Sequence, residues 1–199
     1  MTVGVLALQG DFREHLDALR AVGATAVPVR RPTELAEVDG LIIPGGESTT
    51  IRRLLQAYDL VEPLQERGAA GFPIYGTCAG CILLAREVDG APMPVLGLMD
   101  IGVARNAYGR QVDSFETDVH VPVLGEPLLR AVFIRAPRIE RVGPHVDVLA
   151  RLDDGTVVAA QQGNLLVTTF HPELTGDMRF HRYFLEGLVA GAGQRMAVS

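Results

Sequence analysis

The sequence predicts an α/β fold in which a mostly parallel sheet is covered by helices on both faces. Short apolar runs alternate with amphipathic helical patterns in the first half of the chain, which is the spacing of βαβ units. Several runs are apolar throughout, as expected for strands buried on both faces. The second half carries strand patterns joined by turn residues such as Asp153, Asp154 and Gly155, which predicts some antiparallel strands there.

Four strands are expected in the first half of the chain. They cover residues 3–8, 24–29, 40–46 and 72–76. Pro28 lies inside the second run and has no backbone N–H to donate, so this strand is expected near an edge of the sheet.

Helices are expected between these strands. The first begins at Asp11, with Glu14 three residues later in the spacing of a capping box, and Gly23 stands where it would end. Its apolar face consists of Phe12, Leu16, Leu19 and Val22. Further helical patterns cover residues 49–57 and 61–69.

The second half is expected to be mainly β. Strand patterns cover residues 115–123, 146–152, 156–161 and 164–170. Residues 178–189 predict an amphipathic helix, and the small residues after it predict a frayed tail. No repeat or linker divides the chain, so residues 1–199 are interpreted as one domain.

The composition is typical of a globular protein and argues against several functions. The chain is 48% hydrophobic, and its net charge of −6 disfavours a nucleic-acid partner, which needs clustered positive charge. Because lysine is absent, Schiff-base chemistry and a P-loop are excluded. No apolar run reaches the roughly 20 residues of a membrane span, and the start of the chain does not resemble a secretory signal. A cytoplasmic protein with reduced thiols and no membrane partner is expected.

Both cysteines lie in YGTCAGCIL, residues 75–83. An apolar strand pattern runs into Cys78, and a glycine two residues later opens a helical pattern, which is the context of a nucleophile elbow. Such a turn exposes the thiol at a helix N-terminus, where the dipole favours thiolate. The backbone N–H of Ala79 is then directed to where an oxyanion would form. A structural cysteine at a strand end is the alternative.

Cys81 leaves other interpretations of the C-x-x-C spacing open. A zinc site needs about four ligands, and the chain has no further cysteine. A thioredoxin-like redox pair also begins a helix after a strand, but the aromatic residue expected before it is missing. Apolar residues follow Cys81, so a buried cysteine that packs as a small hydrophobic side chain is the simplest interpretation.

His171 and Glu173 supply a candidate base and a group to orient it. Residues two apart in an extended chain point to the same side, so the Glu173 carboxylate can bind one imidazole nitrogen while the other takes the thiol proton. Parallel sheets carry their sites at the carboxyl ends of strands, where both YGTC and TTFHPE are expected. A solvated histidine beside a glutamate is the alternative.

The loop PGGES, residues 44–48, follows the third predicted strand. Gly45 and Gly46 let the backbone approach a ligand closely, and their N–H groups could complete an oxyanion hole. An ordinary turn before a helix is the competing interpretation. A phosphate-binding loop is disfavoured, because Glu47 would repel the anion.

Six segments together resemble one family. LALQGD, PGGEST, GTCAG, ARNAYGRQ, IRAPRI and TTFHPELTGD are similar to the glutaminase subunits of pyridoxal 5′-phosphate synthase, within the triad class of glutamine amidotransferases. The resemblance covers about residues 3–186. It implies a flavodoxin-like three-layer α/β/α sandwich, which agrees with the βα pattern.

The resemblance also implies a reaction and the residues that perform it. Cys78 would attack the carboxamide of L-glutamine, His171 would transfer the proton and Glu173 would orient His171. A glutamyl thioester would form, ammonia would leave, and water would release glutamate. The implied substrate-binding residues are Gly46, Glu47, Ser48, Arg105, Ile134 and Arg135. An arginine suits a carboxylate because its planar group can bind it bidentately.

The implied partner is a separate (β/α)₈-barrel synthase subunit in a large hetero-oligomer. It would use the ammonia in vitamin B6 biosynthesis, and the glutaminase would be poorly active until docked. Gly46 and Ala79 are implied for the oxyanion hole, and Gln9 is implied near this region and the partner interface. No cofactor or metal is implied.

Two positions depart from the family pattern. Cys81 stands where an apolar residue such as Met is more common, and His145 stands on an expected loop where a small residue is common. The remaining histidines are expected to be structural or solvent-facing: His15, His120 and His181. The rival functions are a thiol–disulfide oxidoreductase that uses both cysteines, and a non-catalytic stress protein with a cysteine elbow. A glutaminase serving a different synthase is the nearest alternative, and RNAYGRQ argues against it.

Overall fold

The computed structural model describes residues 1–92, 95–105 and 114–197. Its strands are β1 (Thr2–Leu6), β2 (Thr25–Val29), β3 (Gly40–Ile43), β4 (Ile74–Thr77), β5 (Ala85–Val88), β6 (Ala91–Pro92), β7 (Met99–Ala104), β8 (Ser114–Val119), β9 (Leu129–Ile134), β10 (Arg138–Val142), β11 (Asp147–Arg151), β12 (Val157–Gln162) and β13 (Leu165–Thr168). Its α-helices are α1 (Phe12–Ala21), α2 (Pro32–Ala36), α3 (Ser48–Ala57), α4 (Val61–Ala69), α5 (Ala79–Leu84), α6 (Arg179–Tyr183) and α7 (Ala190–Ala197). Two 3₁₀ turns and a π-helical stretch complete it: η1 (Pro122–Leu124), η2 (Pro172–Leu174) and η3 (Phe184–Val189).

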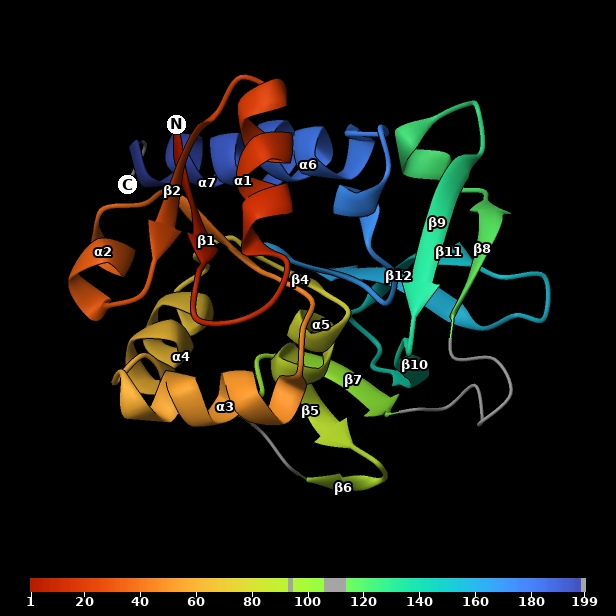
Figure 1. The fold of residues 1–199 in the computed structure, drawn as a ribbon, viewed down its shortest axis with the longest axis horizontal. Coiled ribbons are helices and arrows are strands. Elements are labelled where there is room, and N and C mark those ends of the chain that lie inside the picture. Colours follow the sequence, from red (N-terminus) through yellow and green to blue (C-terminus); the bar gives the residue numbers. More distant parts are fainter. Residues whose placement is uncertain (93–94, 106–113, 198–199) are drawn as a thin grey trace.

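These elements form the predicted three-layer sandwich, with the sheet in the middle. Helices α1, α6 and α7 lie on one face, and α3, α4 and α5 lie on the other (Figure 1). Side chains of a strand alternate between the two faces, so Leu41 and Ile43 of β3 join one core cluster while Ile42 joins the other. Both faces of this strand are therefore buried, which explains its continuous apolar sequence.

The sheet is parallel on one side and mixed on the other, where most pairs are antiparallel but β5 and β7 are parallel. Its strand order is β2-β1-β3-β4-β13-β12-β10-β7-β5-β6, with β11 paired to β12. The strands from β2 to β13 in this order are parallel, whereas β12 runs antiparallel to β13 and to β10. Strands β8 and β9 form a separate antiparallel pair. The edge position of β2 confirms the prediction made from Pro28.

Two sequence predictions need correction. Residues 190–197 form helix α7 instead of a frayed tail, because alanine and other good helix formers offset its two glycines. Several elements had no predicted counterpart: α2, β5, β6, β7, β9 and β10.

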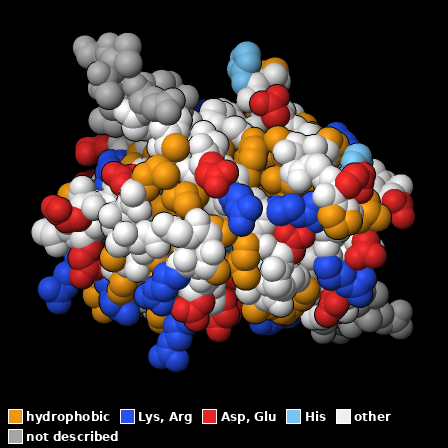
Figure 2. Space-filling model, turned by 90° about the horizontal axis from the view of Figure 1, so that it is seen from above, with side chains coloured by type: hydrophobic (Ala, Val, Ile, Leu, Met, Phe, Trp, Pro, Cys, Tyr) orange, Lys and Arg blue, Asp and Glu red, His pale blue; other side chains and the backbone are white. Residues whose placement is uncertain are grey.

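The surface mixes charge types. On the face seen from above in Figure 2, arginines lie among acidic side chains, and small apolar areas lie between them. Within the described part of the chain, no helix combines the length and apolarity needed to cross a bilayer.

Candidate active site

The pairing of β4 with β13 brings the two predicted halves of the site together. Thr77 is the register partner of Thr168, so both strands end at the same edge of the sheet. The backbone N–H of Cys78 donates to the Thr168 carbonyl at 2.9 Å, which extends this pairing by one residue. The nucleophile candidate and the His171 segment therefore leave the sheet side by side.

Cys78 occupies the turn between β4 and α5 in a strained conformation. Its φ of +47° and ψ of −101° are rare for a residue with a side chain, and such strain is concentrated at functional sites. Gly80 allows this turn to pack tightly, because a Cβ there would lie 2.2 Å from the Ile43 carbonyl oxygen. The Cys78 side chain is nearly buried, and its Sγ lies 3.9 Å from the Ile134 carbonyl oxygen. The strained turn matches the predicted elbow, whereas the thiol, expected to be exposed, is buried.

His171 and Glu173 form a short buried hydrogen bond. The Nδ1 atom of His171 lies 2.7 Å from Oε1 of Glu173, and the carboxylate can only accept, so Nδ1 carries the proton. The His171 backbone N–H donates to the Val132 carbonyl at 2.9 Å, which ties this segment to β9. The other ring nitrogen is left to act as an acceptor, and the neighbouring Cys78 side chain contributes to the raised pKa of His171.

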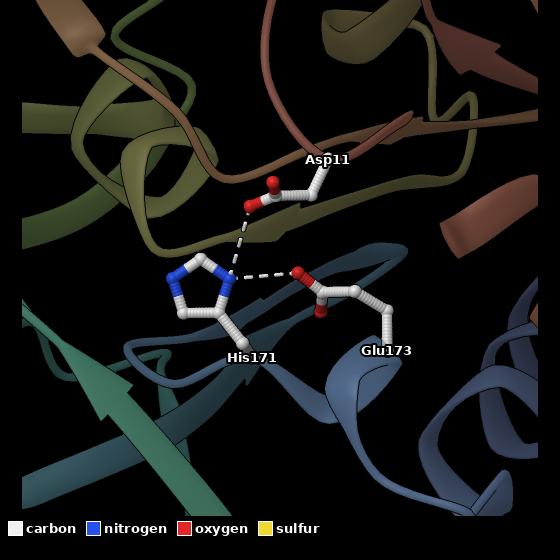
Figure 3. Close-up of side chains that lie close together, drawn as sticks. All are labelled: Asp11, His171 and Glu173. Atoms are coloured by element: carbon white, nitrogen blue, oxygen red, sulfur yellow. Dashed lines mark hydrogen bonds and ion pairs between the residues drawn. The ribbon is translucent and has the colours of Figure 1, made fainter. Parts of the chain in front are cut away.

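Asp11 provides a second carboxylate at the same nitrogen, as Figure 3 shows. Its Oδ2 lies 3.4 Å from Nδ1 of His171. The predicted capping box of Asp11 and Glu14 is wrong: Asp11 is the N-cap residue of α1, but its side chain makes no capping hydrogen bond. Its ψ of 41° lies outside the extended region in which N-cap side chains normally reach back to the helix. The carboxylate faces the imidazole instead.

Burial and hydrogen bonds act in opposite directions on this pair. Burial lowers the pKa of His171, but hydrogen bonds to Asp11, Cys78 and Glu173 and the charge of Glu173 outweigh it and raise the pKa. Burial raises the pKa of Glu173, and the hydrogen bond from His171 opposes that rise. The site therefore stabilises a protonated imidazole, as a base that takes a thiol proton requires.

The loop at residues 44–48 packs directly against the imidazole. A Cβ at Gly45 would lie 2.3 Å from Cε1 of His171, so a side chain at this position would displace the ring. Gln9 joins the loop to the tip of β1, because its Oε1 accepts from the Glu47 N–H at 2.8 Å. The Glu47 carboxylate caps α3 by accepting from the N–H groups of Thr49 and Thr50.

A cavity of about 230 Å³ opens beside α5. Its lining residues are Ser48, Thr49, Arg52, Ile82, Leu83, Val88, Val95 and Arg105. Two of the predicted substrate-binding residues, Ser48 and Arg105, thus face one cavity. The Arg105 guanidinium already pairs with Asp89, with Nη2 and Oδ2 2.7 Å apart. Cys78 is not among the lining residues, but Ile82 lies one helical turn after it.

The other predicted residues divide into three groups. Gly46 lies in the loop beside Gln9, and Ala79 begins α5 directly after Cys78. Ile134 and Arg135 lie at the end of β9 beside the thiol, and Arg135 has a φ of +43°, a second strained residue near the site. The stretch from Asn106 to Gln111 of ARNAYGRQ lies outside the described residues.

Cys81 is confirmed as a core residue. It is fully buried within the cluster packed between α5 and the sheet, and both cysteines are free thiols. Burial raises the pKa of the Cys81 thiol, and the neighbouring Cys78 adds to the rise. Cys81 therefore lacks the exposure and thiolate character of a redox partner. His145 lies in an exposed turn, as expected.

Solved structures define the class of protein. A crystal structure described as that of a glutamine amidotransferase superposes with a TM-score of 0.88 at 50% sequence identity, covering 95% of this chain and 98% of that one. A structure of PurLQS from Thermotoga maritima has a TM-score of 0.71 at 16% identity, covering 93% of this chain and 97% of that one, and shares the fold alone.

The chain belongs to the SNO glutamine amidotransferase family, whose model matches residues 5–190. A relative from Herpetosiphon aurantiacus is 62% identical over 188 residues, 93% of this chain and 99% of the relative. A relative from Pelotomaculum thermopropionicum is 60% identical over 194 residues, 98% of each chain. Both relatives are named pyridoxal 5′-phosphate synthase subunit PdxT. The resemblance inferred from the sequence motifs is thereby confirmed.

Proposed function

We propose that the chain is the glutaminase of a two-part pyridoxal 5′-phosphate synthase, which hydrolyses L-glutamine and delivers the ammonia to a synthase subunit. The observation that carries the proposal is the strained Cys78 beside the buried His171–Glu173 pair, in a chain of this family. Residues 1–199 act as one glutaminase domain. The free thiols suit the cytoplasm, which is the proposed location.

The first half of the reaction forms a thioester. His171 takes the Cys78 proton, and the sulfur attacks the carboxamide carbon of glutamine. As the tetrahedral intermediate collapses, the C–N bond breaks and His171 returns the proton to the leaving nitrogen, which departs as ammonia. Glu173 holds Nδ1–H throughout, so that the opposite ring nitrogen faces the reacting atoms.

The second half returns the enzyme to its starting state. Water attacks the thioester carbon, His171 takes the proton of the water, and the C–S bond breaks to release glutamate and restore the thiol. The N–H groups of Ala79 and Gly46 are the proposed oxyanion donors in both halves.

The cavity beside α5 and the loop at residues 44–48 suggest where the substrate and the partner bind. Ser48 and Arg105, on one cavity, are proposed to hold the amino-acid end of glutamine, together with Gly46, Glu47, Ile134 and Arg135. The proposed partner is a (β/α)₈-barrel synthase subunit in a hetero-oligomer. Its docking near Gln9 would act on the loop at residues 44–48, because the Gln9 side chain is hydrogen-bonded to that loop.

Glutamate release from L-glutamine tests this function. It is measured with and without the cognate barrel subunit for the wild type, Cys78→Ser and Cys81→Ser. The expected result is activity that depends on the partner, disappears in Cys78→Ser and persists in Cys81→Ser. Loss of activity in both variants, with both still folded by circular dichroism, would favour the redox function. A wild type that is silent when docked would refute the glutaminase.

A further inference from the structure

Two histidines that the proposed reaction does not use lie directly behind Glu173. His15 comes from α1 and His181 from α6, and both are fully buried. Burial lowers the pKa of His15, and the charges of His181 and His171 lower it further. Burial also lowers the pKa of His181, to about 4. Both rings are therefore neutral at physiological pH, and each carries one N–H.

The contacts of these rings form a chain that ends on the catalytic carboxylate. Nε2 of His181 lies 2.9 Å from Nδ1 of His15. Nε2 of His15 lies 3.1 Å from Oγ1 of Thr77 and 3.4 Å from Oε2 of Glu173. The other carboxylate oxygen, Oε1, accepts from His171. Each oxygen of Glu173 therefore lies near an imidazole. Among the described residues, Oε2 has no hydrogen-bond partner, and the ring of His15 is 3.4 Å from it.

The tautomers follow from which polar atom is left unpaired. Among the residues that the structure describes, none gives Nδ1 of His181 a hydrogen-bond partner. If it carried the proton, a buried N–H would be orphaned and the bare Nε2 of His15 would face the carboxylate. If the proton is on Nε2 of His181, the unpaired atom is only an acceptor, which costs less. His181 then donates to Nδ1 of His15, and the Nε2–H of His15 points to Oε2 of Glu173 and to Thr77.

We propose that His15 is a positioning residue, whose Nε2–H holds the second oxygen of Glu173 and so fixes the carboxylate that orients His171. His181 selects the tautomer of His15 that makes this possible. The inference rests on the proposed glutaminase function and deepens it. His15 acts only through Glu173, because it reaches neither the thiol nor the cavity beside α5.

A loss of this donor changes both the rate and its pH dependence. Without the N–H of His15, the Glu173 carboxylate loses stabilisation of its charged form, so its pKa rises and the acid limb of the activity profile moves to higher pH. The titratable groups that face Glu173 or its imidazole partner come from every packed element: Asp11 and His15 of the α1 region, Tyr75 and Cys78 of the β4 region, His171, and His181 of α6. The main comparison, His15→Leu with His15→Gln, changes none of these groups except His15.

The test compares His15→Leu with His15→Gln in the docked complex. Leucine fills the space without a donor, whereas the side-chain amide of glutamine can replace the imidazole Nε2–H. We expect His15→Leu to lower kcat roughly 10- to 100-fold with KM changed less than about twofold, and to move the acid limb to higher pH. His15→Gln should recover kcat to within a few-fold and restore the profile. His181→Phe, which removes the donor to His15, should show a smaller loss in the same direction.

A second measurement separates this inference from the proposed function. Alkylation of Cys78 by iodoacetamide, followed by mass spectrometry over a range of pH, reports on the thiol and imidazole without any glutamine turnover. A shifted alkylation profile in His15→Leu, restored in His15→Gln, supports the positioning role even if the wild type hydrolyses no glutamine. Folded His15→Leu with wild-type kcat and profile, or His15→Gln as impaired as His15→Leu, overturns it.

Discussion

The solvent side and the buried side of His171 present the same chemical group in different surroundings. Asp11 on the solvent side has a side chain that is 40% exposed, and its oxygen lies 3.4 Å from Nδ1. Glu173 on the buried side has a fully buried side chain, and its oxygen lies 2.7 Å from the same atom (Figure 3). Each raises the pKa of His171 through a hydrogen bond, and Glu173 also acts through its charge.

The difference teaches that burial and neighbouring hydrogen-bond donors, more than residue type, decide which carboxylate holds the His171 ring. Water and salt screen an exposed carboxylate, so its charge contributes little. The charge of a buried carboxylate is screened much less. Burying that charge costs free energy unless hydrogen-bond donors satisfy the carboxylate oxygens. Glu173 accepts from His171 at one oxygen and has the proposed His15 donor 3.4 Å from the other, whereas the partly exposed Asp11 side chain can turn to solvent. Substitutions on the two sides should therefore differ in effect.

The largest effect is expected for Glu173→Gln. The amide can donate to Nδ1 and favour the wrong tautomer of His171, so kcat should fall by roughly 10²- to 10⁴-fold with little change in KM. The measurement is glutamate release by the docked complex. Asp11→Asn is the matched carboxylate-to-amide control, and its loss should stay below about tenfold. Equal losses would show that the buried side has no special role.

Gly45→Ala should have the next largest effect on activity. The new Cβ would overlap the His171 ring, whose Cε1 is 2.3 Å from the ideal Cβ position, and so shift the base by a fraction of an ångström. A loss of roughly tenfold or more in kcat is expected, because small misplacements in an active site are costly. Gly193→Ala in α7, where a Cβ meets nothing within 4 Å, is the control. Full activity in both variants would contradict the packing role of this loop.

Acid should lower the free energy of unfolding, because the fold keeps the buried histidines neutral. The unfolded chain binds a proton at His181 near pH 6.5, whereas the folded chain does so only near pH 4, so stability falls as pH drops between these values. His181 alone should lower the free energy of unfolding by roughly 2 kcal/mol between pH 7 and pH 5.

Urea unfolding at the two pH values measures this difference. His181→Phe should show a smaller pH dependence than the wild type. His120→Gln is the control, because its side chain is largely exposed. A wild-type pH dependence in His181→Phe would show that this ring is not held neutral by the fold.

The smallest effect is expected for the pKa of His171 in the Asp11→Asn variant. Removal of this hydrogen-bonding carboxylate should lower the pKa of His171, because Asp11 raises it in the wild type. The displacement should be smaller than that produced by Glu173→Gln, because Glu173 raises this pKa through its charge as well as through a hydrogen bond. Histidine NMR titrations, with His171 assigned from a His171→Asn spectrum, measure both. A larger change in the His171 pKa for Asp11→Asn than for Glu173→Gln would show that Asp11 is the stronger influence on the ring.

The sequence predicted those features that depend on residues close together in the chain. Continuous apolar runs predicted β1, β3 and β4, and the short segment from His171 to Glu173 predicted a pair that touches. Strand β10, with sequence RIERV, was missed because it is only partly buried and alternates poorly. Patterns of this kind describe a strand by its environment, so half-exposed strands leave weak signals.

The contacts of α1 with the site could not be predicted, because they join residues far apart in the chain. Asp11 had the spacing of a cap, and nothing local indicated that its carboxylate faces His171. A signal for His15 did exist. It lies on the apolar face defined by Phe12, Leu16 and Leu19, where a polar ring must find a buried partner.

The register between β4 and β13 has a consequence for protein synthesis. The thiol of Cys78 is made early, directly after β4, whereas His171 comes only after β13, when the chain has passed through the strands from β5 to β12. A ribosome-bound or prematurely terminated chain that lacks β13 has Cys78 without His171 or Glu173. By the proposed route, such fragments would hydrolyse no glutamine and release no ammonia. Under this proposal, activity would require the pairing of β13 with β4.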